Sequence, residues 1–362
     1  MNIVINDVAV KKDSGGVYTV LRQLYEAAKI DSENKYFFIL GSKLFDDSQN
    51  VKVISRPDLQ QNYVKRTLFD FGIGSKFILK YHPDIVVSMQ NTGILGLKNI
   101  KQYIYLHQPL PFQRSFAFRP WKKKEMKLSF YQYVVGTLIK LSYLFNKKSV
   151  VIVQSHWLRK ELLIRGLKEI DKVIVTQPKL ASNIKLLHND LIVNKKNSFF
   201  YPSTAMPYKN HSVIIEALKY LTEEQRKHIN VFLTLDENEY NDLVGSELPE
   251  EVKLLGRMAH KDVLELMSKS TLIFASQIES FGLPILEAKS LNRTILVNDV
   301  EVLRETVGNY DKVAYFDGDN PESLAQAMLN VIKNYENTVS YFKIDQIDES
   351  DVMKNLIEEI TK

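Results

Sequence analysis

The feature that most limits the fold of this chain is a regular alternation between short β-rich runs and longer amphipathic stretches. In the first half the strand-like runs are NIVIN, KYFFIL, DIVVSM, KQYIYL and SVVIVQ. The helix-like stretches of this half lie near 17–29, 62–80, 121–145 and 156–166. This alternation is typical of parallel sheets whose two faces are covered by helices. We therefore expect an α/β architecture.

The second half repeats the pattern. Its strand-like runs are NSFFY, NVFLTL, VKLL, TLIFAS, TILVN and KVAYF, and its helix-like stretches lie near 210–221, 260–269, 284–291, 300–307 and 321–334. The segment at about 178–198 is polar and mixed in pattern, as expected for an interdomain connection. A chain of 362 residues is long enough for two domains of common size. We predict two doubly wound Rossmann-like domains facing across a cleft, at 1–178 and 179–345, with a C-terminal helix at 346–362 that packs back on the first domain.

Composition excludes several classes of chemistry. The chain has no cysteine, so disulfides, thiolate nucleophiles and Cys-type zinc sites are excluded. Its seven histidines show no ligand spacing, and no bound metal or cofactor is expected. The N-terminal run resembles a strand rather than a signal peptide, and no apolar run approaches the roughly 20 residues that span a bilayer. We expect a cytoplasmic protein.

The stretch QIESFGLPILEAKS at 277–290 follows the strand-like run TLIFAS and is built to begin a helix. Pro284 suits the first helical position, which puts Glu279 in the preceding loop and Glu287 in the first turn. The free N–H groups of such a helix start favour an anion, and Gly282 allows the anion to approach the backbone. Ligands of doubly wound sheets bind at this edge, so the stretch predicts a site for a phosphate beside two carboxylates.

These residues resemble a known family. ESFGLPILEA is similar to the E-x7-E motif of retaining family-4 glycosyltransferases, which have the two-domain GT-B fold. The resemblance extends to four further motifs: GG at Gly15 and Gly16, KN at Lys209 and Asn210, LLGRM at 254–258 and YFDGDN at 315–320. It implies a nucleotide-diphosphate sugar as donor, with UDP or GDP as the nucleotide, bound by the domain at 179–345, and it implies that the domain at 1–178 is the acceptor side.

The resemblance also implies catalytic roles. A nucleotide-diphosphate sugar releases an anionic leaving group, so fixed donors aimed at its phosphates are the largest expected catalytic contribution. Lys209 is similar in position to the family's phosphate-binding lysine, and Glu279 to the carboxylate that faces the donor sugar. His107 ends a strand and resembles a family histidine near that sugar. No enzyme nucleophile or general base is implied, because the leaving phosphate itself helps to take the acceptor's proton.

The remaining residues of the resemblance imply contacts with the donor. Glu287 corresponds to the carboxylate that accepts hydrogen bonds from the ribose hydroxyls, and Gly15 and Gly16 to a loop that closes on the distal phosphate. The backbone amides at Phe281, Gly282 and Leu283 are expected to contact the phosphates or the sugar. Arg257 and Met258 are expected near the base or the diphosphate.

One departure from the family stands out. The family carries an arginine five or six residues before the lysine, whereas this chain has Ser203 and Thr204 there. A hydroxyl can donate a hydrogen bond but supplies no charge. We expect Arg257 to compensate, and the same departure leaves open a weak or inactive relative.

Structural explanations of these residues also stay open. Acids are common at helix starts, so Glu279 and Glu287 alone would suit a solvated helix end. Lys209 would equally suit a solvated loop, Gly15 and Gly16 a simple turn, and His107 a hydrogen-bonded strand end. A D-x-D pair at Asp317 and Asp319 is interpreted as a turn after the last strand.

Basic charge is concentrated in the first half. Residues 1–178 carry 28 Lys or Arg against 14 Asp or Glu, although the whole chain has a net charge of only +5. Within them, residues 113–148 hold nine basic residues and one Glu, interleaved with Phe116, Phe118 and Trp121. Such a mixture of basic and aromatic residues is typical of an anionic membrane surface. Most of the aromatic helix that follows, from Phe130 to Phe145, is instead expected to pack in the protein core. No nucleic-acid motif accompanies it, so no nucleic acid is expected as a partner.

The sequence thus predicts a metal-independent, retaining glycosyltransferase that transfers a sugar to a saccharide acceptor, lipid-linked, in surface or capsular polysaccharide synthesis. Its expected location is the cytoplasm, peripheral on the inner face of the plasma membrane. The alternative is a non-catalytic protein of the same fold that binds nucleotide sugars or polyanions.

Overall fold

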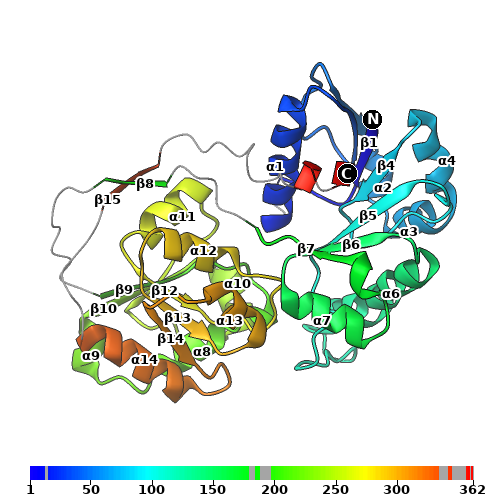
Figure 1. Cartoon of the computed structure of the whole chain (residues 1–362). Coiled ribbons are helices and arrows are strands. Elements are labelled where there is room, and N and C mark those ends of the chain that lie inside the picture. Colours follow the sequence, from blue (N-terminus) through cyan, green and yellow to red (C-terminus); the bar gives the residue numbers. More distant parts are fainter. Residues whose placement is uncertain are drawn as a thin grey trace. The chain divides into compact units, whose positions relative to one another are not determined.

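A computed structural model describes residues 1–12, 15–178, 184–187, 197–333, 341–344, 356–358 and 360–361, with the backbone alone at 184–187 and 341–344. The chain forms two compact units (Figure 1). Unit 1 comprises Met1–Ala181 and Asp348–Lys362, and unit 2 comprises Ser182–Ile347. Each unit contains one parallel sheet covered by helices, so the predicted pair of doubly wound Rossmann-like domains is confirmed.

The sheet of unit 1 has seven parallel strands in the order β3-β2-β1-β4-β5-β6-β7. Strand β1 has β2 on one side and β4 on the other, so the strand order reverses between β1 and β4. Polar residues that follow these two strands therefore meet at a topological switch point. The strand bounds are Asn2–Asp7, Lys35–Leu40, Val51–Ser55, Ile85–Ser88, Lys101–Leu106, Val150–Val153 and Val173–Val175 for β1 to β7.

Helices cover both faces of this sheet. The helix bounds are Gly16–Ile30, Pro57–Gln60, Tyr63–Leu68, Gly74–Ile78, Met126–Phe130, Gly136–Phe145 and His156–Ile164 for α1 to α7. Successive side chains of β1 point to opposite faces. Ile3 and Ile5 join a core with α1 that also holds Leu356, Ile357 and Ile360, whereas Val4 packs with residues of α2 and α4 on the other face.

The two long helices expected at 62–80 and 121–145 are each interrupted. A π-helical turn at Phe69–Ile73 separates α3 from α4, and another at Tyr131–Val135 separates α5 from α6. Residues 121–125 form turns rather than helix. A π-helical turn changes which side chains point inward, and such turns are frequent at functional sites.

Unit 2 has a six-stranded parallel sheet in the order β11-β10-β9-β12-β13-β14, which reverses between β9 and β12. The strand bounds are Asn197–Tyr201, Ile229–Leu233, Val252–Leu254, Thr271–Phe274, Ile295–Asn298 and Val313–Phe316 for β9 to β14. The helix bounds are His211–Leu218, Glu223–Lys227, Glu237–Leu243, His260–Met267, Leu283–Ser290, Glu301–Val307 and Pro321–Lys333 for α8 to α14.

The segment expected to connect the domains contains a strand. β8, Ile184–Leu187, pairs antiparallel with β15, Tyr341–Ile344, in a separate two-stranded sheet. The other residues at 179–196 lie outside the described ranges. Among the described residues, no helix combines the length and the apolar character that crossing a membrane requires.

Candidate functional site

Lys209 and Glu279 meet at the switch point of unit 2. Lys209 ends a short 3₁₀ turn, Pro207–Lys209, that follows β9, and Glu279 lies in the loop after β12. The two residues are 70 positions apart, yet Lys209 Nζ donates a hydrogen bond to Glu279 Oε1 in an ion pair. The sequence predicted both residues at this edge, and the parallel pairing of β9 with β12 brings them together.

This ion pair is largely shielded from water. The side chains of Lys209 and Glu279 are 16% and 13% exposed. The Lys209 ammonium also lies 5.7 Å from the ring centre of Tyr208 and 5.9 Å from that of Phe274. A half-buried charge interacts more strongly with its neighbours than a charge in water does. Lys209 is therefore a fixed cation rather than a solvated loop residue.

The helix after Glu279 begins at Leu283, one residue earlier than predicted. Its N-cap is Gly282, with φ of 106°, a left-handed conformation that favours glycine. Pro284 consequently lies at the second helical position, and Glu287 lies in the second turn rather than the first. The carbonyl of Phe281 accepts a hydrogen bond from Thr306 Oγ1, which ties this loop to α13.

Glu287 has a partner that the sequence did not predict. It is 9% exposed, and its Oε1 lies 2.7 Å from Nε2 of His260, the first residue of α11. The loop that leads into α11 holds Arg257, which is exposed, and Met258, which is half-buried. The contact between His260 and Glu287 therefore links the LLGRM loop to α12.

The loop after β14 is hydrogen bonded to residues that follow β9 and end β13, at the same edge of the unit 2 sheet. Gly318 donates its N–H to Asn298 Oδ1 at 2.9 Å, and its carbonyl accepts from Asn210 Nδ2 at 2.7 Å. The D-x-D pair forms a turn, as predicted, because the Asp319 N–H donates to Asp317 Oδ1 at 2.9 Å. The KN and YFDGDN motifs are thus joined by hydrogen bonds, which their separation in sequence does not reveal.

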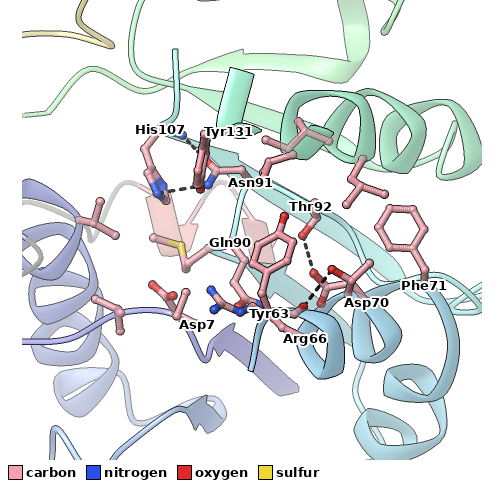
Figure 2. Close-up of a pocket in the computed structure, with 18 residues that line it drawn as sticks. Asp7, Tyr63, Arg66, Asp70, Phe71, Gln90, Asn91, Thr92, His107 and Tyr131 are labelled. Atoms are coloured by element: carbon pink, nitrogen blue, oxygen red, sulfur yellow. Dashed lines mark hydrogen bonds between the residues drawn. The ribbon is translucent and has the colours of Figure 1, made fainter. Parts of the chain in front are cut away.

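The predicted residues of unit 1 lie at its own switch edge. Gly15 caps α1 with φ of 59°, and Gly16 is the first residue of that helix. His107 follows β5, and both its backbone N–H and its ring contact the side chain of Asn91 (Figure 2). Burial lowers the pKa of His107 to about 4, so its ring is neutral near pH 7.

Sequence reasoning missed the groups around His107. A pocket of about 180 Å³ is lined by His107, Val17 next to Gly16, and the polar side chains of Asp7, Arg66, Asp70 and Gln90 (Figure 2). Asp7 ends the first strand and Gln90 follows β4 by two residues, so both positions could have been found from the strand order. Arg66 and Asp70 carry no sequence signal of this kind.

Comparison with known proteins finds similarity in the second unit. Residues 184–343 match the family model for glycosyl transferases, group 1. The match lies within unit 2 and covers less than half of the chain. The serotype-specific mannosyltransferase WbdA of Escherichia coli is 29% identical over 146 residues, which are 38% of this chain and 18% of WbdA. The O-antigen chain mannosyltransferase RfbU of Salmonella typhimurium is 25% identical over 165 residues, 42% of this chain and 45% of RfbU. The chain thus spans less than half the length of either relative.

A solved structure extends the likeness to both units. The HepE protein of Anabaena, crystallised with UDP-glucose, is 16% identical, with a TM-score of 0.64 over 99% of this chain and 95% of HepE. Similarity at this level shows the fold. The whole chain has the GT-B fold of two Rossmann-like domains.

Proposed function

We propose that this protein is a retaining, metal-independent glycosyltransferase that moves a sugar from a UDP- or GDP-sugar to a saccharide acceptor in surface polysaccharide synthesis. The observation that carries the proposal is the ion pair between Lys209 and Glu279 at the switch point of a glycosyltransferase domain, with Glu287 on the following helix. The polysaccharide mannosyltransferases WbdA and RfbU support the acceptor class. The UDP-glucose complex of HepE supports a nucleotide sugar as donor.

The residues of unit 2 suit departure of a nucleotide diphosphate. In the proposed reaction, the bond between the anomeric carbon and the phosphate oxygen breaks while negative charge develops on the phosphate. In this proposal, Lys209 and the amides at the start of α12 stabilise that charge. Arg257, on the loop after β11, adds a second cation. In this proposal it compensates for the family's arginine, since this chain has Ser203 and Thr204 at that position.

The anomeric configuration is retained if the acceptor attacks the anomeric carbon from the same face on which the phosphate departs. The acceptor hydroxyl forms the new bond to the anomeric carbon, and its proton passes to a leaving phosphate oxygen. Glu279 orients the donor sugar and Glu287 the ribose hydroxyls. His107 is neutral at pH 7, so it can offer a hydrogen bond but no charge.

The test begins with a thermal-shift panel of UDP-, GDP-, dTDP- and ADP-sugars on the wild type and on Glu287→Ala. Binding to the native state raises Tm by mass action. We expect one nucleotide class to raise Tm in the wild type and not in Glu287→Ala. Glu322→Ala, which removes an exposed glutamate from the first turn of α14, serves as the matched control.

Transfer assays with the identified donor then test the reaction itself. NMR of the product reports whether the anomeric configuration is retained, and activity in excess EDTA reports whether a metal is required. Donor binding without hydrolysis or transfer would favour the non-catalytic alternative that Ser203 and Thr204 motivate. No shift with any nucleotide would contradict the proposal.

We further propose that unit 1 docks on the anionic inner face of the plasma membrane, where a lipid-linked acceptor would lie. The support is an exposed set of aromatic and apolar side chains beside the lysines at 122–124: Trp121 is 79% exposed, Met126 56%, Phe130 48% and Tyr133 48%. Each lysine near an anionic bilayer contributes about 1 kcal/mol, and aromatic side chains favour the interface.

Vesicle co-sedimentation tests this docking. We expect binding to vesicles that contain phosphatidylglycerol, and a loss of more than tenfold when Lys122, Lys123 and Lys124 are changed to Glu. A matched triple change to Glu at the exposed Lys52, Lys76 and Lys98 alters the net charge of unit 1 equally. Equal losses in both triple variants would show a general charge effect and contradict a specific docking face.

A further inference from the structure

Asn298 lies between two of the loops that form the candidate site of unit 2. It is the last residue of β13, whose neighbours in the sheet are β12 and β14. The residue is buried, with 4% of its surface exposed. Because the ends of parallel strands meet at one edge of a sheet, a side chain at this position can reach the loops that follow both neighbours. Asn298 belongs to none of the sequence motifs that predicted the site.

Both ends of the Asn298 side chain are hydrogen bonded to main chain. Its Nδ2 donates to the carbonyl of Ser276 at 3.1 Å, in the loop after β12 that leads to Glu279. Its Oδ1 accepts from the N–H of Gly318 at 2.9 Å, in the loop after β14. Ser276 and Gly318 are themselves buried, where a main-chain group without a partner is unfavourable. One amide side chain therefore ties these two loops together.

Two further hydrogen bonds connect the same loops to Lys209. The Gly318 carbonyl accepts from Asn210 Nδ2 at 2.7 Å, on the C-terminal side of Lys209. The Tyr208 carbonyl accepts from the N–H of Gln277 at 2.8 Å, on its N-terminal side. Hydrogen bonds and main chain thus form a closed ring, here named the loop ring, which comprises residues 208–210, 276–277, 298 and 318.

The loop ring holds the main chain that carries the ion pair. Lys209 lies within the ring, and Glu279 follows it by two residues in the loop after β12. A lysine has a long, flexible stem, and in the proposed reaction its ammonium acts on a phosphate. The contact with Glu279 therefore cannot by itself fix Lys209. The hydrogen bonds of the loop ring use neither charged group, so a bound phosphate does not compete for them.

Gly318 shows how closely the loop after β14 approaches Asn298. A Cβ added at Gly318 would lie 2.6 Å from Asn298 Oδ1 and 2.7 Å from its Nδ2. Atoms cannot come so close, so any larger residue at 318 would displace the Asn298 amide. Gly318→Ala therefore disturbs the loop ring from one of its loops, whereas Asn298→Ala removes the side chain that joins two of them.

We propose that Asn298 is a positioning residue for sugar transfer, which keeps Lys209 and Glu279 in place through the loop ring. The proposal rests on the proposed function, because it assigns the support of the two residues that act on the donor. Asn298 is buried and both its polar atoms are engaged, so it acts through these residues and not on the substrate. A displacement of about 1 Å in an acting group can lower a rate by about 10²-fold.

Amide hydrogen exchange, followed by NMR, tests the loop ring without any substrate. In Asn298→Ala the Gly318 N–H loses its acceptor directly, whereas the Gln277 N–H keeps Tyr208 and loses only the support transmitted through its loop. We expect both amides to exchange faster than in the wild type, by about tenfold or more. An unchanged rate at Gln277 would overturn the loop ring as a unit.

Two other variants accompany this test. Asn309→Ala changes an exposed asparagine of unit 2, in the turn after α13, and should leave the exchange rates at Gly318 and Gln277 unchanged. Gly318→Ala should raise the rate at Gln277 as Asn298→Ala does, and it carries the test if Asn298→Ala does not fold. All chains are compared well below their Tm, so that global unfolding does not contribute to exchange.

Transfer kinetics with the donor identified by the nucleotide panel test the positioning role. We expect Asn298→Ala to lower kcat by about tenfold or more and to change KM for the donor by less than about threefold, with Asn309→Ala unchanged in both. In a Lys209→Met chain, the same Asn298→Ala change should lower kcat by less than about twofold, because the residue through which it acts is gone. Equal losses in the two backgrounds would overturn the proposal. No transfer by the wild type would count against the proposed function, and the exchange rate at Gln277 then decides whether the loop ring exists.

Discussion

At the residue scale, this protein places charged groups where water is scarce and gives them different partners. Lys209 and Glu279 neutralise each other in an ion pair, whereas Asp7 and Asp70 share the single cation Arg66. Breaking a largely buried pair leaves one charge uncompensated, and burial without sufficient pairing favours the neutral form of an acid. The two arrangements predict different consequences of mutation.

Lys209→Met keeps most of the side-chain length and removes the charge. Loss of a fixed donor to a developing phosphate charge should lower the rate of sugar transfer by about 10²–10³-fold. Steady-state assays with the donor identified by the nucleotide panel give this rate. Lys219→Met is the matched control, since Lys219 is exposed and pairs only with Glu216 in the described part of the chain. A rate within threefold of the wild type would show that Lys209 does not act on the phosphates.

Asp7→Asn should change how stability depends on pH. The pKa of Asp7 is about 8 in the folded chain and about 3.8 ordinarily, so between these values the folded chain holds a proton that the unfolded chain has lost. The free energy of unfolding of the wild type should therefore fall with rising pH relative to Asp7→Asn, by at most about 1.4 kcal/mol per pH unit.

Urea unfolding at pH 5 and pH 7.5 measures this difference. The two tryptophans of the chain, Trp121 and Trp157, both lie in unit 1, so their fluorescence follows the unit that contains Asp7. Asp171→Asn, at a residue with a 60% exposed side chain, is the control. Parallel stability profiles for wild type and Asp7→Asn would mean that Asp7 is ionised in the folded chain.

At the scale of elements, the start of α12 depends on the backbone of one glycine. Gly282→Ala would hold an alanine at φ of 106° and bring its Cβ to 3.2 Å from Leu303 Cδ2. We expect a loss of about 1–2 kcal/mol in stability, together with weaker donor binding, because the amides of the helix start would shift. Circular dichroism during thermal unfolding and nucleotide titration measure the two effects.

Gly72→Ala provides the contrast for this variant. Gly72 lies in a helical turn of unit 1 without a positive φ, and nothing lies within 4 Å of an added Cβ. Alanine should be tolerated there or should stabilise the chain slightly. A similar loss in both variants would show that the conformation of Gly282 has no special role.

The same scale shows what the sequence could and could not predict. The central strands are continuous apolar runs and were located closely, but β3 and β7 were missed. β3 is an edge strand with only Val51 fully buried, and β7 has three residues, so neither gives a strong pattern. The ESFGLP motif was found because its residues are neighbours in sequence. The pocket of unit 1 was not, because Asp7, Arg66 and Gln90 meet only through strand order and the packing of α3.

At the scale of the whole molecule, two units of like topology each gather polar side chains at the point where the strand order reverses. In unit 2 these are Lys209 and Glu279, which follow β9 and β12; in unit 1 they are Asp7 and Gln90, beside β1 and β4. Parallel sheets leave a crevice at such a point, so the same geometry supplies both sites. Different side chains then give the two points different chemistry, an ion pair in unit 2 and two buried carboxyl groups beside Arg66 in unit 1.

Unit 1 is built from two segments of the chain, Met1–Ala181 and Asp348–Lys362, so its stability should depend on the last residues of the chain. Ile360 is fully buried in the core that contains β1 and α1. Ile360→Ala should therefore cost about 2–4 kcal/mol and lower the urea midpoint seen by tryptophan fluorescence. Glu358→Ala, an exposed position of the same segment, should leave the midpoint unchanged.

Unit 2 has its own sheet and core, so the Tm shift with the donor nucleotide should survive in Ile360→Ala. An unchanged fluorescence midpoint would mean that the C-terminal segment is not part of the core on which unit 1 depends.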